Sequence, residues 1–208
     1  MRPIYLDYNA TTPADPEVVE ELLPYLSGEF GNPSSGHAYG KKAREAVELA
    51  RERVAALLGC EPAEVIFTGG GTESNNQALI GAALANRDRG THIISTTIEH
   101  PAVLKPLERL GEEGFSVTLL PVDGTGRVDP DLVRRALRGD TILISVMHAN
   151  NEVGTIQPIR EIGEIARERG IIFHTDAAQS VGKIPTRIGE LQVDLLTVAG
   201  HKVYAPKG

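Results

Sequence analysis

The stretch Ile159-Arg-Glu-Ile-Gly-Glu-Ile-Ala-Arg-Glu-Arg-Gly-Ile-Ile-Phe-His-Thr-Asp176 joins a helical segment to a short apolar run. Residues 159–169 predict a helix, and residues 171–174 predict a buried strand that leads to the carboxylate of Asp176. Residues 141–146, which precede this stretch, form another apolar run and predict a second strand. Strands that alternate with helices of this length are typical of a parallel sheet.

The same alternation continues over most of the chain. Further apolar runs predict strands at residues 65–68, 92–96, 117–121 and 195–198. Helical stretches lie between most of them, at residues 74–85, 102–113 and 130–137. Two helices are expected earlier, at residues 15–26 and at residues 41–58, and the second has an apolar stripe of Ala43, Ala46, Val47, Ala50, Val54 and Leu57. We therefore predict an α/β fold, with a mostly parallel sheet covered by helices on both faces.

The composition excludes several classes of protein. The chain has 208 residues, of which 41% are hydrophobic and 24% charged, as is usual for a globular domain with one good-sized core. The net charge of −7, without a basic stripe, argues against nucleic-acid binding. No apolar run predicts a membrane span and the first residues lack a signal-peptide pattern, so we expect a cytoplasmic protein. A single cysteine excludes an internal disulfide, and the histidine spacing predicts no metal site.

Polar residues follow most of the predicted strands. They are Thr72, Glu99 and His100, the segment 148–152, the segment 176–179, and finally His201 and Lys202. Ligands of such sheets bind outside the carboxyl ends of the strands. These residues therefore predict a single binding site.

Lys202 and Asp176 indicate the chemistry of that site. A lysine amine forms the Schiff base with pyridoxal phosphate, and a carboxylate pairs with the nitrogen of its ring. Taken alone, Lys202 could be a solvated surface residue, and Asp176 could be a helix cap or a partner in a buried ion pair. The small residues Ala199 and Gly200 before Lys202 favour the cofactor site, because they allow the backbone to approach a ligand closely.

The glycine-rich turn at residues 69–72 is a candidate phosphate site. Glycines let the backbone approach an anion, and free N–H groups at the start of a helix attract phosphate. The alternative is an ordinary strand-to-helix turn capped by Thr72 or Ser74. The turn has neither the P-loop pattern nor the spacing of a dinucleotide-binding loop.

Three further features have a structural and a functional interpretation. His100 could simply be the residue at which a helix begins, or its ring could lie flat on a cofactor and move protons. Residues 150–152 could simply form a turn, or they could supply, with Gln179, neutral donors to a cofactor oxygen. Cys60 lies in a turn without a neighbouring cation to lower its pKa, and we interpret it as structural.

Together, seven segments resemble the cysteine desulfurases of the NifS/IscS type, within the fold-type I pyridoxal-phosphate enzymes. The segments are residues 5–13, 31–35, 67–75, 99–100, 147–154, 174–182 and 200–208. They extend from one end of the chain to the other. The sequences Asn-Asn-Glu-Val-Gly at 150–154 and Gly-His-Lys at 200–202 favour this branch over the SufS-like branch.

The resemblance implies a role for each matching residue. Lys202 would hold the cofactor covalently, Asp176 would pair with the ring nitrogen, and His100 would stack on the ring and assist proton transfer. The remaining roles concern oxygens: Gln179 would bond the ring hydroxyl, Asn151 that oxygen or the substrate carboxylate, and Thr72, His201 and the backbone near Gly71 the phosphate. The family commonly has a serine where this chain has Ala199, so one phosphate contact would be missing.

The resemblance also implies a division of the protein. Family members are about twice as long as this chain, as expected for a two-domain enzyme. Residues 1–15 would be an extended segment that packs with the small domain, and residues 16–208 would be the large, cofactor-binding domain, truncated after Lys202. The small domain, the persulfide-forming cysteine and the arginine for the substrate carboxylate would be absent. We therefore expect this chain alone to be inactive.

For the complete protein, the resemblance implies conversion of L-cysteine to L-alanine with formation of a protein persulfide. A sulfur acceptor, such as an iron–sulfur scaffold protein or a tRNA-thiolation protein, would then take the sulfur, and the full-length enzyme would be a homodimer. Another fold-type I enzyme, such as a selenocysteine lyase, and a non-catalytic remnant that binds a partner are the alternatives.

Overall fold

The computed structural model describes residues 3–207. The predictions for residues 1, 2 and 208, at the two ends of the expected domains, lie outside the described residues. Residues 3–15 contain no helix or strand. Within residues 3–207, no helix combines the length and the apolar character needed to cross a membrane. The same residues contain no group of three or more His, Cys, Asp and Glu side chains that could hold a metal ion.

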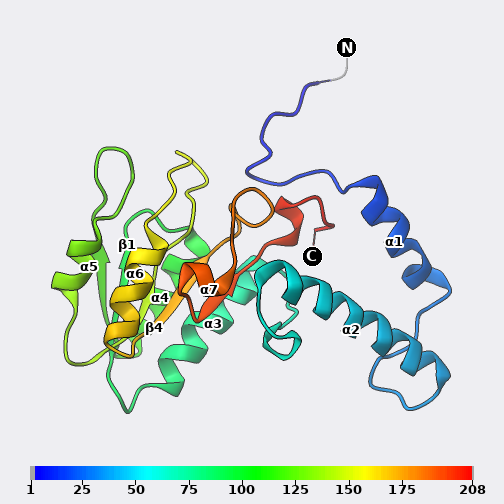
Figure 1. The fold of residues 1–208 in the computed structure, drawn as a ribbon, viewed down its shortest axis with the longest axis horizontal. Helices are drawn as coiled ribbons and strands as arrows, with labels where there is room; N and C mark the ends of the chain where they lie inside the picture. The colour runs from blue at the N-terminus through cyan, green and yellow to red at the C-terminus, as the bar shows by residue number, and fades with distance from the viewer. Residues whose placement is uncertain (1–2, 208) are drawn as a thin grey trace.

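One parallel sheet organises the described part of the chain (Figure 1). Its strands are β1 (His92–Thr96), β2 (Ser116–Leu120), β3 (Thr141–Ser145), β4 (Ile172–Asp176) and β5 (Leu195–Thr197). They lie in the order β2-β1-β3-β4-β5, and each neighbouring pair is parallel. The order reverses between β1 and β3, which is where sheets of this class form a crevice. Because β4 lies beside β5, Asp176 is directly opposite Thr197.

Two helix layers cover the sheet, as the alternation of strands and helices predicted. Helices α5 (Pro130–Ala136) and α6 (Ile159–Glu168) contribute to the apolar core on one face, which includes Ile94. Helices α3 (Gly71–Ala85) and α4 (Pro101–Glu112) contribute to the core on the other face, which includes Ile93. Successive side chains of a strand point to opposite faces, so neighbouring residues of a covered strand, such as Ile93 and Ile94, enter the cores on opposite sides. The predicted α/β fold class is confirmed.

The first two helices lie beside the sheet and do not cover it. Figure 1 shows α1 (Pro16–Ser27) and α2 (Ala38–Leu58) together at one end of the molecule. Helix α1 buries no residue within the described chain, and α2 buries Gly40 and Ala43 near its start and Ala55 and Leu58 near its end. The predicted stripe of α2 is therefore wrong in part, since Ala43 is buried but Leu57 is 55% exposed. The helical periodicity was present, but most of this helix has no sheet beneath it.

The predicted strand at residues 65–68 is wrong. These residues pair with no strand among residues 3–207, and they follow a single 3₁₀ turn, η1 (Pro62–Glu64). The Arg51 side chain donates a hydrogen bond to the Val65 carbonyl and lies over the Phe67 ring, 5.1 Å from its centre. A side chain thus satisfies a backbone group that a neighbouring strand would satisfy in a sheet. Ile66 and Phe67 remain exposed.

Two further short elements near the carboxyl end were not predicted. They are α7 (Ile188–Leu191) and η2 (Gly200–Lys202). Elements of three or four residues are too short to produce a hydrophobic period. The bounds of the other predicted strands and helices lie within three residues of the observed ones.

Candidate functional site

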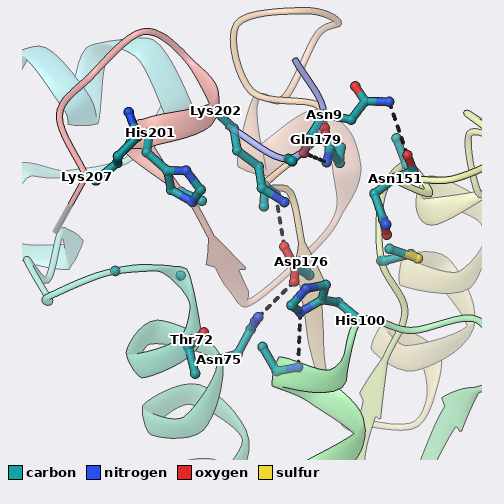
Figure 2. A pocket seen from close by; sticks show the side chains of 18 of the residues that line it. Asn9, Thr72, Asn75, His100, Asn151, Asp176, Gln179, His201, Lys202 and Lys207 are labelled. Carbon is teal, nitrogen blue, oxygen red and sulfur yellow. Dashed lines mark hydrogen bonds between the residues drawn. The ribbon is translucent and has the colours of Figure 1, made fainter. Parts of the chain in front are cut away.

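A cavity of about 1150 Å³ opens at the carboxyl ends of the strands. All eight residues that the sequence predicted for the site line it: Gly71, Thr72, His100, Asn151, Asp176, Gln179, His201 and Lys202. They come from the start of α3, the segment before α4, the loops after β3 and β4, and the segment after β5 (Figure 2). The fold brings these eight residues together, while their individual roles remain predictions.

Asp176 lies at the inner wall of the cavity, at the end of β4. Its carboxylate is only 6% exposed, yet both of its oxygens have donors. Asn75 Nδ2 lies 2.8 Å from Oδ2, and the backbone N–H of Ala178 lies 2.9 Å from Oδ1. These donors stabilise a buried negative charge, which would otherwise be costly. A carboxylate held in this way can face a cationic group in the cavity.

Lys202 ends the short turn η2 that follows β5, and its side chain extends toward Asp176 (Figure 2). Burial lowers the pKa of the Lys202 amine. The charge of Asp176 opposes this effect, and the charge of Lys183 adds to it. A lysine with a lowered pKa has a larger neutral fraction and is a better nucleophile.

The glycine turn begins α3 with its backbone toward the cavity. Gly70 has φ of 152°, and no side chain caps the helix start. The first N–H groups of a helix have no partner within the helix, and Gly71 and Thr72 line the cavity at this point. A Cβ atom on Gly71 would lie 3.2 Å from the Cβ of Ala199, so a larger residue at position 71 would be crowded against Ala199 at the start of α3. The site can therefore bring N–H groups close to an anion.

His201 lies where the amino-terminal segment meets the end of β5. Its ring Nδ1 is 3.0 Å from Thr11 Oγ1, and its carbonyl accepts hydrogen bonds from Thr12 N and Oγ1, both at 2.9 Å. Burial lowers the pKa of His201, and the charges of Lys202 and Lys207 lower it further. A neutral imidazole can donate a hydrogen bond to an anion from one nitrogen only.

The chain turns back directly after Lys202. Tyr204 has φ of 65°, which is unusual for a bulky residue. Its N–H donates to Thr12 Oγ1 and its carbonyl accepts from Asp15 N, both at 2.9 Å. The amino-terminal segment therefore holds the turn that positions Lys202.

His100 has the structural role that was one of its two interpretations, because it caps α4. Its Nδ1 accepts a hydrogen bond of 3.1 Å from the N–H of Ala102. The same ring lies beside Asp176 at the cavity wall (Figure 2). The cap fixes the ring orientation, so capping and cofactor stacking are compatible.

Asn9 joins the two predicted amide residues of the site. Its carbonyl accepts a 2.8 Å hydrogen bond from Gln179 Nε2, and its own amide donates to the Asn151 carbonyl at 3.1 Å. Asn151 Nδ2 donates to Glu152 at 2.7 Å. The segment that contains Asn9 thus lies across the cavity and connects the loops after β3 and β4 (Figure 2).

Residues 4–208 match the family described as aminotransferase class-V. The chain belongs to this family. Class-V aminotransferases depend on pyridoxal phosphate. The sheet order and the structural neighbours below correspond to the large domain of fold-type I enzymes, as predicted.

Curated relatives of this class-V chain are named cysteine desulfurase IscS. The protein from Dictyoglomus turgidum is 56% identical over 207 residues, which are 100% of this chain and 52% of the relative. The protein from Methanosarcina thermophila is 55% identical over 205 residues, which are 99% of this chain and 51% of the relative. The chain therefore spans about half the length of the curated relatives it matches.

Two solved structures are similar to this class-V chain over nearly its whole length. A structure described as SspA in complex with cysteine has a TM-score of 0.95 and 44% identity, with 98% of this chain and 59% of that chain covered. A NifS-like protein has a TM-score of 0.96 and 42% identity, with 99% of this chain and 57% of that chain covered.

The residues present in this class-V chain fit pyridoxal phosphate. An amine with a lowered pKa, a buried carboxylate with two donors, and an uncapped helix start match the aldehyde, the ring nitrogen and the phosphate of that molecule. The match involves three different chemical groups that lie in one cavity.

Sequence reasoning missed Asn75, the buried donor to Asp176. Asn75 lies three residues after Thr72 on α3, so both side chains are on neighbouring positions of one helix face. That spacing could have identified Asn75 once Thr72 was a candidate. Its partner, however, is 101 residues away in the sequence.

Glu99 was noticed only as a polar residue at a strand end. In this class-V fold it is buried beneath the site, where its Oε1 accepts hydrogen bonds from Thr96 Oγ1 at 2.7 Å and Met147 N at 2.9 Å. Burial raises the pKa of Glu99 to about 8. The two hydrogen bonds oppose this effect, and the charge of Asp176 adds to it. Glu99 is therefore mainly protonated at neutral pH.

A buried histidine links the strands below the site. His174 on β4 contacts Ser145 Oγ of β3 at 2.9 Å and Thr197 Oγ1 of β5 at 3.1 Å. Burial lowers the pKa of His174 to about 4, although the charge of Asp176 acts in the opposite direction. A neutral ring on β4, the strand that ends in Asp176, therefore bonds to both neighbouring strands, β3 and β5.

Cys60 lies outside the cavity of this class-V chain, after the end of α2. Burial raises the pKa of its thiol, and the charges of Glu64 and Glu61 raise it further. A raised pKa leaves little thiolate at neutral pH. This position agrees with the structural interpretation of Cys60.

Proposed function

We propose that the full-length protein is a pyridoxal-phosphate-dependent cysteine desulfurase, which converts L-cysteine to L-alanine and retains the sulfur as a protein persulfide. The observation that carries the proposal is the joint position of the Lys202 amine and the buried Asp176 carboxylate in one cavity, beside the uncapped start of α3. The names of relatives that are more than half identical support the choice of cysteine as substrate.

Lys202 and Asp176 would have different chemical roles in this reaction. Lys202 would bind the cofactor covalently and move a proton at the α-carbon of the substrate, for which a lowered amine pKa is suited. Asp176 would keep a proton on the ring nitrogen, with Asn75 and the Ala178 N–H holding its carboxylate in place. When bound, pyridoxal phosphate supplies an electron sink for the substrate.

The remaining site residues would bind and orient. The start of α3 and His201 would hold the phosphate, Gln179 the ring oxygen, and Asn151 that oxygen or the substrate carboxylate. His100 would cover the ring, in an orientation fixed by its hydrogen bond from Ala102 N. The nucleophilic cysteine that takes the sulfur would belong to a part of the protein that these residues do not include.

The sulfur would pass to an acceptor in iron–sulfur cluster assembly or tRNA thiolation, and the enzyme would act as a cytoplasmic homodimer. The IscS name of the relatives supports the first of these acceptors. The negative net charge of −7 gives no electrostatic reason for direct binding of tRNA. A sulfur-carrying protein is therefore the partner that we propose.

Borohydride reduction of the full-length protein, loaded with pyridoxal phosphate, tests the proposal. We expect peptide mapping to find the reduced cofactor on Lys202, and Lys202→Ala to abolish the label. A label on Lys183 or Lys207, or no label, would contradict the assignment. In the same protein, L-cysteine should yield alanine and, with a reductant, sulfide in equal amounts, whereas release of alanine from selenocysteine alone would indicate a selenocysteine lyase.

A further inference from the structure

Both the oxygen and the nitrogen of the Gln179 side-chain amide have hydrogen-bond partners, of which one is a donor and the other an acceptor. Lys183 Nζ donates to Gln179 Oε1 at 3.1 Å, while Gln179 Nε2 donates to the Asn9 carbonyl at 2.8 Å. An ammonium group can only donate, and a carbonyl oxygen can only accept. The two partners therefore leave the amide one permitted orientation, in which the oxygen faces Lys183 and the nitrogen faces Asn9.

This orientation decides what Gln179 offers to the cavity. An amide nitrogen carries two N–H groups, and the Asn9 carbonyl uses one of them. The second remains available at a residue that is 8% exposed and lines the cavity. A flipped amide would instead present its oxygen, which would repel an anionic oxygen of a ligand.

The local backbone keeps Lys183 and Gln179 on the same side of a tight turn. The N–H of Val181 donates to the Ala177 carbonyl, and the N–H groups of Lys183 and Ile184 donate to the Ser180 carbonyl. Val181 is buried against Ala177 and Leu58, which anchors the turn to the end of α2. The turn and its packing therefore keep Lys183 close to Gln179, four residues earlier in the sequence, while the Lys183 side chain remains exposed.

We propose that Lys183 is a positioning residue of this site, which fixes the Gln179 amide as a hydrogen-bond donor toward an anionic ring oxygen of the bound cofactor. This inference rests on the proposed function, because it requires pyridoxal phosphate in the cavity. Lys183 acts through Gln179 and does not line the cavity itself.

Electrostatics favour the same arrangement. The positive charge of Lys183 contributes to the lowered pKa of Lys202, in addition to the larger effect of burial. The charged side chains that line the cavity itself are Asp7, Glu73, Glu152, Asp176, Lys202 and Lys207. A cation beside Gln179 therefore favours an anionic ligand oxygen in a site that also contains carboxylates.

The test compares three variants of the full-length protein: Lys183→Met, which keeps the length but removes the donor; Lys183→Arg, which keeps a donor; and Lys105→Met, which removes an exposed cation on α4. The dissociation constant for pyridoxal phosphate is measured by absorbance. We expect Lys183→Met to raise it about tenfold, which is the effect of one hydrogen bond to a charged group. Lys183→Arg and Lys105→Met should stay within about twofold of the wild type.

A second measurement separates action through Gln179 from a general effect of charge. In a Gln179→Ala background, the Lys183→Met change should have little further effect, because the amide that Lys183 orients is gone. An equal weakening in both backgrounds, or a normal dissociation constant in Lys183→Met, would overturn the inference alone. Failure of the wild type to trap the cofactor on Lys202 with borohydride would overturn the proposed function and this inference with it.

Discussion

The amide of Asn75, on α3, donates a hydrogen bond of 2.8 Å to the carboxylate of Asp176, at the end of β4. Asn75 is buried, and its other amide atom, Oδ1, has no partner among the described residues. A buried amide atom without a partner costs free energy, whereas the hydrogen bond that the amide nitrogen makes to the charged carboxylate is stabilising. Its use here is to hold a buried carboxylate that faces the cavity.

Replacement of Asn75 by Leu should lower kcat/KM of the full-length enzyme by about 10- to 100-fold, because a hydrogen bond to a charged group is worth about 1.5–3 kcal/mol. Gln77→Leu, at an exposed position of the same helix, is the matched control and should have no effect. Steady-state kinetics with cysteine provide the measurement. An Asn75→Leu enzyme within twofold of the wild type would show that Asp176 does not depend on this donor.

Asp176→Asn should leave the cofactor bound but lower turnover by several powers of ten. The substitution removes the charge that we propose to pair with the ring nitrogen of the cofactor, and it preserves the size of the side chain. We expect a loss of about 3–6 kcal/mol of transition-state stabilisation, measured as the ratio of kcat/KM values. Turnover near the wild-type rate would mean that the carboxylate has only a structural role.

Glu99→Gln should change how stability depends on pH. Burial raises the pKa of Glu99 from 4.5 to about 8, so between these values the folded protein keeps a proton that the unfolded chain releases. Stability therefore falls as the pH rises through this window, by up to about 1.4 kcal/mol per pH unit. Glutamine cannot ionise, so the variant should lose less stability from about pH 5 to about pH 8.

Urea unfolding of the two proteins at several pH values measures this difference. Glu112→Gln, on the exposed side of α4, is the control and should unfold with the same pH dependence as the wild type. Parallel stability curves for wild type and Glu99→Gln would show that Glu99 is already ionised in the folded protein.

Cys60→Ala should leave persulfide formation in the full-length enzyme within about twofold of the wild type. The thiol lies outside the cavity, and burial raises its pKa, so little nucleophilic thiolate is present. Residues 1–208 alone, incubated with pyridoxal phosphate, cysteine and a reductant, should release no stoichiometric sulfide and alanine. Mass spectrometry of the Cys60 peptide completes the test, and a persulfide found there would make Cys60 the nucleophile.

The strands and helices that cover one another could be predicted from sequence because burial leaves short apolar runs in the strands and a helical period in the helices. β1 was predicted at its observed bounds, and the site residues Asp176 and Lys202 were found because they follow such runs. The failures have the opposite cause. Residues 65–68 are apolar, but strand formation depends on a partner, and the pattern of one segment does not contain its partner.

The supporting residues of the site could not be predicted for a similar reason. Asn9, Asn75 and Lys183 act through contacts with groups on other segments or with a single side-chain atom, and no local pattern records them. Glu99 was visible as a polar residue after a strand, but its raised pKa depends on burial by the finished fold. Local sequence therefore identified the residues that line the cavity better than the residues that hold them in place.

The hydrogen bonds between Thr12 and His201 determine when this part of the site can fold during synthesis. The ribosome makes residue 12 long before residue 201, so the amino-terminal segment emerges without the carbonyl to which it binds. Contacts between such distant residues form late in folding, because a long loop must close first. The nascent chain can build its sheet from β1 onward, but Thr12 can bind the His201 carbonyl, next to Lys202, only after these residues have left the exit tunnel. We therefore expect a ribosome-bound chain to acquire the cofactor at the end of translation of this region, not during it.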